Sequence, residues 1–133
     1  MYKEALQIAY NAHKGQLRKQ GLVSYIVHPL RVASQFTDDT KRTIAILHDV
    51  IEDTDVTMDF LKTVFPESVT DIVDILSRGQ FENHFDYISR VKANDIATEI
   101  KIADIVDNLS DTLCILPKSM AERYDKSLDI LIN

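Results

Sequence analysis

The sequence predicts an all-α fold: a compact, single-domain helical bundle of about seven or eight helices that covers residues 1–133. Glycine and proline each occur only three times in the 133 residues, too rarely to punctuate a sheet of many strands. Apolar residues recur along most of the chain with the period of an amphipathic helix. The composition, 45% hydrophobic and 27% charged, is that of a globular domain large enough to bury a core.

The first two helices are predicted from apolar spacing and from proline. Residues 2–16 carry apolar side chains at helical spacing and end close to Gly15, a residue type that commonly follows a helix. Residues 18–27 are expected to form a loop, although the last four of them could instead form a short strand. Pro29 suits the first turn of a helix through residues 30–36, because an amide in that turn has no helical partner to lose.

A third, longer helix is predicted over residues 38–53, which open with capping aspartates and continue with apolar residues at helical spacing. Two short helices follow over residues 54–65 and 66–78, the second opened by a proline. Three more are expected over residues 84–94, 95–113 and 117–132. Asp95 is the expected N-cap of the second of these three.

Charge and hydropathy exclude several classes of protein. The formal net charge of −6 argues against a general nucleic-acid-binding surface, which needs many cations facing the phosphate backbone. A small phosphorylated ligand needs only a few local cations. No apolar run approaches the roughly 20 residues of a membrane span, and the N-terminus lacks the apolar core of a signal peptide. The lone Cys114 indicates a reducing compartment, so we expect a cytoplasmic protein without membrane or nucleic-acid partners.

Four ionisable residues interrupt the apolar stretch of residues 45–54: His48, Asp49, Glu52 and Asp53. Spacings of three and four residues place them in one broad sector of a helix, where the carboxylates repel one another unless a cation neutralises them. His48 and Asp49 could supply two ligands to a divalent metal ion. Glu52 and Asp53 could hold or deprotonate a water molecule one turn further on. The alternative is a solvated acidic helix end, but the apolar neighbours favour a metal.

Further ligands have to come from other segments, and two candidates are present. His28 lies directly before Pro29 at a helix start, where the backbone is rigid, although a single histidine of this kind is often structural. Asp104 lies one turn before Asn108 in an otherwise apolar helix, and a buried carboxylate needs a partner. The alternative partner for this carboxylate is the nearby Lys101.

Other polar residues have weaker claims to the site. His13 lies in a polar turn and is expected to pack beside the site rather than to bind metal. His84 starts a helix and is expected at the surface. Asp107 and Asp111 are expected on the solvated face of their helix.

The stretches that carry these residues, YIVHP, HDVIEDT and KIADIVDNL, resemble the HD-domain metal phosphohydrolases. They are especially similar to the alarmone hydrolases of the RelA/SpoT type, in particular the small stand-alone ones. The resemblance begins at AHKGQLRKQG and continues through LSRG and FDYISRV to RYDKSLDIL. It implies an HD-type bundle and a manganese-dependent enzyme that removes the 3′-pyrophosphate from ppGpp. With no synthetase domain in the resemblance, we expect degradation of the alarmone and not its synthesis.

Positions that match the family's motifs take their roles from this resemblance. The implied metal ligands are His28, His48, Asp49 and Asp104. The implied catalytic carboxylates beside the attacking water are Glu52 and Asp53. The implied substrate-binding residues are Arg18 and Lys19, over the phosphates, and Asn108, near the nucleotide.

Three functions remain open on the sequence. The first is a ppGpp-type hydrolase, and the second is a metal phosphohydrolase acting on another nucleotide, such as the 2′-phosphate of NADPH. The third is a non-catalytic metal- or nucleotide-binding module, against which the pair Glu52 and Asp53 argues, because binding alone does not require both. A solvated basic turn is the alternative for Arg18 and Lys19. The loop before Tyr25 also lacks the Gly-x-Pro common in the family, which leaves its shape open.

Overall fold

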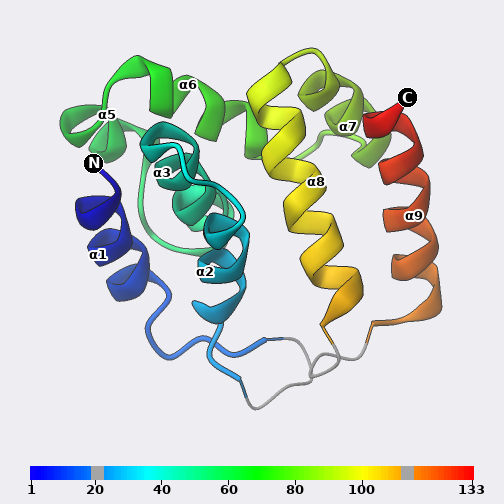
Figure 1. Ribbon diagram of the computed structural model, residues 1–133, viewed down its shortest axis with the longest axis horizontal. Coiled ribbons are helices and arrows are strands. Elements are labelled where there is room, and N and C mark those ends of the chain that lie inside the picture. Colours follow the sequence, from blue (N-terminus) through cyan, green and yellow to red (C-terminus); the bar gives the residue numbers. More distant parts are fainter. Residues whose placement is uncertain (19–22, 112–115) are drawn as a thin grey trace.

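Helices account for every regular element in the described part of the chain, residues 1–18, 23–111 and 116–133, of the computed structural model (Figure 1). Nine helices are described there: α1 (Tyr2–Ala12), α2 (Val27–Ser34), α3 (Asp39–Leu47), α4 (Val50–Asp53), α5 (Met58–Val64), α6 (Glu67–Leu76), α7 (His84–Lys92), α8 (Asp95–Ser110) and α9 (Lys118–Ile132). The predicted all-α class is confirmed. None of these helices has both the length and the apolar character that crossing a membrane requires.

The helices form two groups that meet at α8 (Figure 1). In the first group, α1, α2 and α6 all pack on α3, and α5 leads into α6. In the second group, α7 and α9 pack on each other and on α8. Because α8 also contacts α2, α3 and α6, one face of this helix is opposed by the first group along its length.

The core is centred on α3. Five consecutive residues, Thr43–Leu47, have no exposed surface. The last four of them belong to one hydrophobic cluster with fully buried residues of α7 and α8, namely Ile88, Ile100 and Ile105. A fully buried leucine or isoleucine stabilises the fold by roughly 1.5–3 kcal/mol relative to an exposed one. The C-terminal end of α3 is therefore firmly anchored, and so are the residues that follow it.

Side-chain caps determine where several helices begin. The carboxylate of Asp38 accepts a hydrogen bond from the amide of Lys41 at 2.9 Å, and the side chain of Asn94 accepts one from the amide of Ala97 at 2.9 Å. Such caps are worth about 1 kcal/mol each. Asp95, the predicted cap of α8, is instead its first helical residue. Its negative charge there interacts favourably with the positive end of the helix dipole.

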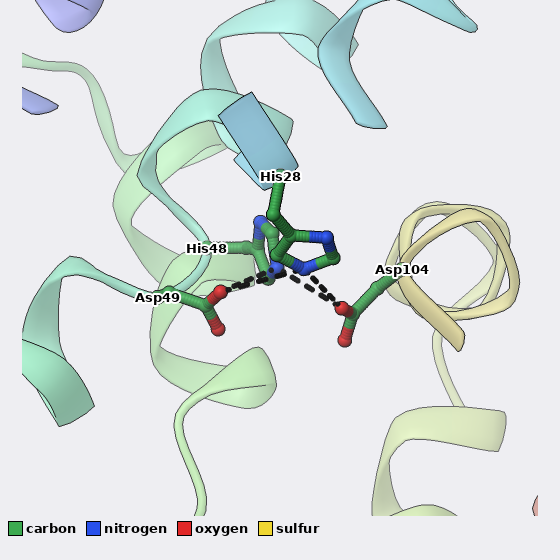
Figure 2. Close-up of side chains that lie close together, drawn as sticks. All are labelled: His28, His48, Asp49 and Asp104. Atoms are coloured by element: carbon green, nitrogen blue, oxygen red, sulfur yellow. Dashed lines mark hydrogen bonds and ion pairs between the residues drawn. The ribbon is translucent and has the colours of Figure 1, made fainter. Parts of the chain in front are cut away.

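The prediction of one continuous helix over residues 38–53 is wrong, because a two-residue turn at His48 and Asp49 separates α3 from α4. The ring of His48 donates through Nδ1 to the carbonyl of Ala45 at 2.6 Å. A continuing helix would pair this carbonyl with the amide of residue 49. The turn directs both side chains toward residues of α2 and α8 (Figure 2).

Two short segments pair ahead of α2 through an isolated antiparallel bridge. The amide of Arg18 donates to the carbonyl of Val23 at 2.9 Å, and the amide of Tyr25 donates to the carbonyl of Gln16 at 2.8 Å. The alternative, a short strand over the last four residues of this loop, is limited to the single bridging residue Ser24, because a turn at Tyr25 and Ile26 leads directly into α2. The pairing holds Arg18 and Tyr25 next to the start of α2.

Candidate metal centre and adjoining cleft

The four residues that the sequence predicts as metal ligands lie together inside the protein (Figure 2). His28 comes from the first turn of α2, His48 and Asp49 from the turn between α3 and α4, and Asp104 from α8. One ligand atom of each residue lies within 4.8 Å of the ligand atoms of the other three. The four residues are at most 9% exposed.

The ring of His48 turns its Nε2 toward the cluster. Its Nδ1 donates to the backbone, so Nε2 is the nitrogen that can bind a metal ion once it has given up its proton. This Nε2 is buried and has no hydrogen-bond partner within the described ranges, although it lies 3.0 Å from Oδ2 of Asp49 and 3.4 Å from Oδ1 of Asp104. A donor set of two imidazoles and two carboxylates, with a buried nitrogen lacking a partner, fits a divalent metal ion.

The second imidazole, that of His28, contacts carboxylates through both ring nitrogens. Nε2 lies 2.8 Å from Oδ1 of Asp104 and 3.7 Å from Oδ2 of Asp49, inside the cluster. Nδ1 lies 2.7 Å from Oδ2 of Asp107. Burial alone would lower the pKa of His28, but the hydrogen bonds to Asp104 and Asp107 raise it.

The charges of the cluster support one another. Burial opposes the charge on His48, but the carboxylates of Asp49 and Asp104 outweigh burial and raise its pKa well above the usual range. Burial likewise opposes ionisation of the two carboxyl groups, but His48 lowers the pKa of Asp49, and Lys101 with His48 lowers that of Asp104. Both carboxyl groups are therefore ionised at neutral pH.

Asp104 has both of the partners that the sequence offered as alternatives. Its Oδ1 faces the histidines, while its Oδ2 lies 2.8 Å from Nζ of Lys101. The side chain of Lys101 is 15% exposed and that of Asp104 is 5% exposed. The ion pair with Lys101 is therefore compatible with the position of Asp104 in the metal cluster.

Glu52 and Asp53 lie outside the four-residue cluster but beside it. Oδ2 of Asp53 lies 3.2 Å from the hydroxyl of Tyr25, which donates to Oδ2 of Asp49 at 2.6 Å. Oε1 of Glu52 accepts a hydrogen bond from the amide of Arg78 at 2.5 Å. Partial removal from water, and then the charge of Asp49, raise the pKa of both carboxyl groups.

A cleft of about 610 Å³ opens beside the metal cluster, a size suited to a small-molecule ligand. Its walls combine charged, polar and aromatic side chains with a few apolar ones. Those of direct interest are Arg18, Tyr25, His28, Asp49, Glu52, Asp53, Lys101, Asp104, Asn108 and Tyr124. Carboxylates of the metal cluster line the cleft together with two cations, Arg18 and Lys101, each of which lies against a carboxylate.

Two of the three predicted substrate-binding residues border this cleft, and Lys19 lies outside the described residues. The guanidinium of Arg18 donates to Oδ1 of Asn108 at 2.9 Å and lies 3.2 Å from Oδ2 of Asp111. With only 6% of its surface exposed, Arg18 does not belong to a solvated basic turn.

The prediction of a solvated face for Asp107 and Asp111 is wrong. The side chain of Asp111 is 3% exposed and that of Asp107 is 14% exposed. Arg31, which the sequence analysis missed, contacts both carboxylates at 2.7–3.2 Å. The signal was present, because Arg31 follows His28 by three residues and Asp107 follows Asp104 by three, which places each pair on one helix face.

The remaining polar residues of interest also have defined surroundings. His13 is fully buried, and its ring centroid lies 4.9 Å from that of Tyr25, which agrees with packing beside the site. His84 is not a plain surface residue, because its Nε2 lies 2.9 Å from the hydroxyl of Ser127. Partial burial lowers the pKa of His84 to about 4, with the charges of nearby cations adding to the effect.

Comparison with known proteins gives a consistent result. A family model described as an HD domain matches residues 5–111. The guanosine-3′,5′-bis(diphosphate) 3′-pyrophosphohydrolases of Borreliella burgdorferi and Haemophilus influenzae are each 34% identical to this chain over 92% of its length. The chain spans about a fifth of the length of these curated relatives.

A solved structure has a closely similar fold. It is described as a metazoan ortholog of SpoT that hydrolyzes ppGpp and plays a role in starvation responses. It aligns with a TM-score of 0.79 at 25% identity, and the alignment covers 98% of this chain and 84% of the other. The similarity therefore includes nearly every element that positions the metal cluster and the cleft.

Proposed function

The chain belongs to the HD-domain family, and on this premise we propose that it is a metal-dependent phosphohydrolase that removes the 3′-pyrophosphate from ppGpp-type guanosine nucleotides. The named activities of its relatives support this substrate. The observation that carries the proposal is the buried Nε2 of His48, which lacks a hydrogen-bond partner in the described segments and faces two carboxylates next to a cleft. The lone cysteine supports a cytoplasmic location.

We assign the ion as Mn²⁺, held by His28, His48, Asp49 and Asp104. Mixed nitrogen and oxygen ligation without cysteine suits manganese or iron better than a structural zinc. When bound, the ion supplies Lewis acidity toward a phosphoryl oxygen and lowers the pKa of water.

The carboxylates of Glu52 and Asp53 are assigned to proton transfer. In this hydrolysis a water oxygen bonds to the phosphorus next to the 3′ oxygen, the bond between that phosphorus and the 3′ oxygen breaks, and the one proton that the water loses to a carboxylate is returned to the 3′ oxygen. Glu52 accepts the proton that the water loses, a task favoured by its raised pKa. Tyr25 lies within hydrogen-bond distance of Asp53 and holds this carboxylate toward the cleft.

The phosphate groups of the substrate are assigned to the cationic part of the cleft. Arg18 and Lys101 both line it, and each lies against a carboxylate that fixes its position. Asn108 lies beside Arg18 and is proposed to contact the nucleotide. Lys19, outside the described residues, is proposed to act with Arg18.

A substrate screen tests this function. Purified protein is stripped of metal with a chelator, reloaded with Mn²⁺, and incubated with ppGpp, NADPH and simple nucleoside phosphates. We expect release of pyrophosphate from ppGpp, dependent on the ion. Turnover of NADPH alone would overturn the substrate assignment. Metal binding without turnover of any nucleotide would leave a binding module instead of an enzyme.

The substitution Glu52→Gln separates catalysis from metal binding. Loss of a general base costs about 10²–10⁴ in rate, whereas the four ligands stay in place. We expect a folded, metal-loaded protein with little turnover, compared on one preparation by metal content, melting temperature and rate. Glu122→Gln, on the exposed surface of α9, is the matched control and should retain full activity. Loss of metal from the Glu52 variant would make this residue a ligand and contradict the assignment.

A further inference from the structure

A carboxylate lies directly behind one of the proposed metal ligands. Nδ1 of His28 points away from the cluster and lies 2.7 Å from Oδ2 of Asp107. Asp107 follows Asp104 by one turn of α8, so both carboxylates face α2. We propose that Asp107 is a positioning residue that holds the ring of His28 and keeps the proton on Nδ1, so that Nε2 is presented to the metal. This inference rests on the proposed metal site.

The carboxylate of Asp107 is itself held on both oxygens. Nε of Arg31 donates to Oδ1 at 2.7 Å, and Nη2 of Arg31 lies 3.2 Å from Oδ2, the oxygen that contacts His28. A bidentate contact of this kind fixes the plane of the carboxylate as well as its position. His28 and Arg31 are one turn apart on α2. This single helix therefore carries both the proposed ligand His28 and the residue Arg31, which orients the carboxylate that contacts His28.

The contacts continue from Arg31 until they return to the metal cluster. Arg31 donates to Asp111 at 2.8 Å, which lies 3.2 Å from Arg18. Arg18 donates to Asn108 at 2.9 Å, and Asn108 lies 3.3 Å from Oδ1 of Asp104. These contacts run from His28 to Asp104, and the contact between these two proposed ligands closes them into a ring. Every member of the ring is therefore restrained from two sides.

The two histidine ligands are therefore oriented by the same principle but by different groups. His48 has its Nδ1 fixed by the backbone carbonyl of Ala45, whereas His28 has its Nδ1 fixed by the side chain of Asp107. Partners of this kind set the tautomer and the direction of a ligand and raise its basicity. Only the partner of His28 can be removed by substitution, which makes His48 an internal reference.

Metal affinity tests the proposal without any measurement of turnover. Removing a partner of this kind typically weakens metal binding about 10- to 100-fold, and we expect such a loss in Mn²⁺ affinity for Asp107→Ala, measured from the paramagnetic resonance signal of the free ion. Asp107→Asn, which keeps an accepting oxygen but loses the charge, should fall between this variant and wild type. It also carries the test if the alanine variant does not fold.

Two control variants separate positioning from a purely structural role. Arg31→Met breaks the ion pair between α2 and α8 but leaves the contact between Asp107 and His28. Glu99→Gln breaks the ion pair between α8 and Lys41 of α3, at 2.8 Å, a contact that includes none of the proposed ligands. We expect Arg31→Met to weaken Mn²⁺ binding less than Asp107→Ala does, and Glu99→Gln to leave it unchanged. An equal loss for Arg31→Met and Asp107→Ala would mean that the ion pair only holds the helices together, and would overturn the proposal.

Nitrogen-15 spectra of the histidine rings, recorded on protein loaded with diamagnetic Zn²⁺, provide the second readout. In wild type, His28 and His48 should both carry the proton on Nδ1. Asp107→Ala should change the Nδ1 signal of His28 and leave that of His48 in place. If the His28 signal and the Mn²⁺ affinity both stay as in wild type, the positioning role is wrong while the metal site stands. If wild-type protein binds neither ion, the proposed metal site fails, and the positioning role fails with it.

Discussion

His28 and His84 occupy similar places in their helices but differ in their electrostatic surroundings. His28 is the second residue of α2, and His84 is the first residue of α7. Both therefore lie at the positive end of a helix dipole, which opposes protonation. The pKa of His28 is nevertheless raised, whereas that of His84 is lowered to about 4.

The difference comes from the neighbours of each ring. Burial would lower the pKa of His28, but a carboxylate at each ring nitrogen reverses that effect. His84 meets only the hydroxyl of Ser127 at its Nε2. Partial burial lowers its pKa first, and the positive charges of Arg123, Lys101 and Arg78 lower it further.

The comparison shows what makes a buried imidazole a site for a cation. Both residues lie at a helix start, so this position does not explain the opposite shifts in their pKa. The sign of the charges around each ring does explain them. Lys101 takes part in both environments, because it pairs with Asp104 at 2.8 Å and also lowers the pKa of His84. One cation therefore balances the metal cluster on one side and disfavours positive charge on the other.

Removing the two imidazoles in turn should produce the largest contrast. His28→Ala removes one of four proposed ligands and should abolish stoichiometric metal binding and turnover. His84→Ala should retain the full metal content, because no cation binds among the positive charges around this ring. The measurement is metal content by elemental analysis after gel filtration, with circular dichroism to check folding. Equal metal content in the two variants would break the comparison.

Lys101→Met tests the residue that the two environments share. Removing one partner of a buried ion pair typically costs about 3–5 kcal/mol, so we expect a loss of this order in the free energy of unfolding of the metal-free protein. A divalent ion should recover more stability in this variant than in wild type, because the ion neutralises Asp104 in place of the lysine. The pKa of His84 should rise toward its ordinary value.

Chemical denaturation with and without Mn²⁺ gives the first two quantities, and a histidine titration by NMR gives the third. Lys118→Met is the control, because this lysine is 91% exposed and lies 4.0 Å from its partner Glu122. A Lys101 variant with wild-type stability and an unshifted His84 would show that the lysine balances neither environment.

The helices could be predicted from sequence because their causes are local. Apolar spacing, caps and prolines act over a few residues, and the order of the elements follows from them. The break between α3 and α4 could not be predicted, because it accompanies a bond between the ring of His48 and the carbonyl of Ala45. The spacing of apolar residues in the sequence is the same whether or not this hydrogen bond forms.

The candidate site was predictable where motif spacing was informative, and not where it depended on a second helix. His28, His48, Asp49 and Asp104 could be proposed from their motifs before any contact was known. The sequence predicts a solvated Asp107, because a carboxylate beside apolar residues of one helix gives no sign of which helix faces it. Only the packing of α2 on α8 shows that Arg31 lies opposite Asp107 and that the side chain of Asp107 is only 14% exposed.

The smallest effect expected is a pH dependence that belongs to His84 alone. Its pKa is about 4 in the folded protein, against an ordinary value of 6.5. Above pH 6.5 the ring is neutral in both states, and His84 adds no pH dependence. Between pH 6.5 and 4 the unfolded chain takes up a proton that the folded protein refuses, so the free energy of unfolding falls as the pH falls.

His84→Gln removes this titration while keeping a polar group near Ser127. We expect the loss of stability from pH 7 to pH 5, measured on metal-free protein by chemical denaturation, to be smaller in the variant than in wild type. The difference should be on the order of 1 kcal/mol, less than the full pKa shift implies, because the ring is partly open to solvent and salt screens its neighbours. Other acidic and basic groups titrate in both proteins and cancel in the difference. Parallel stability curves for the two proteins would show that the pKa of His84 is not lowered in the folded protein, and the contrast with His28 would then lose its second side.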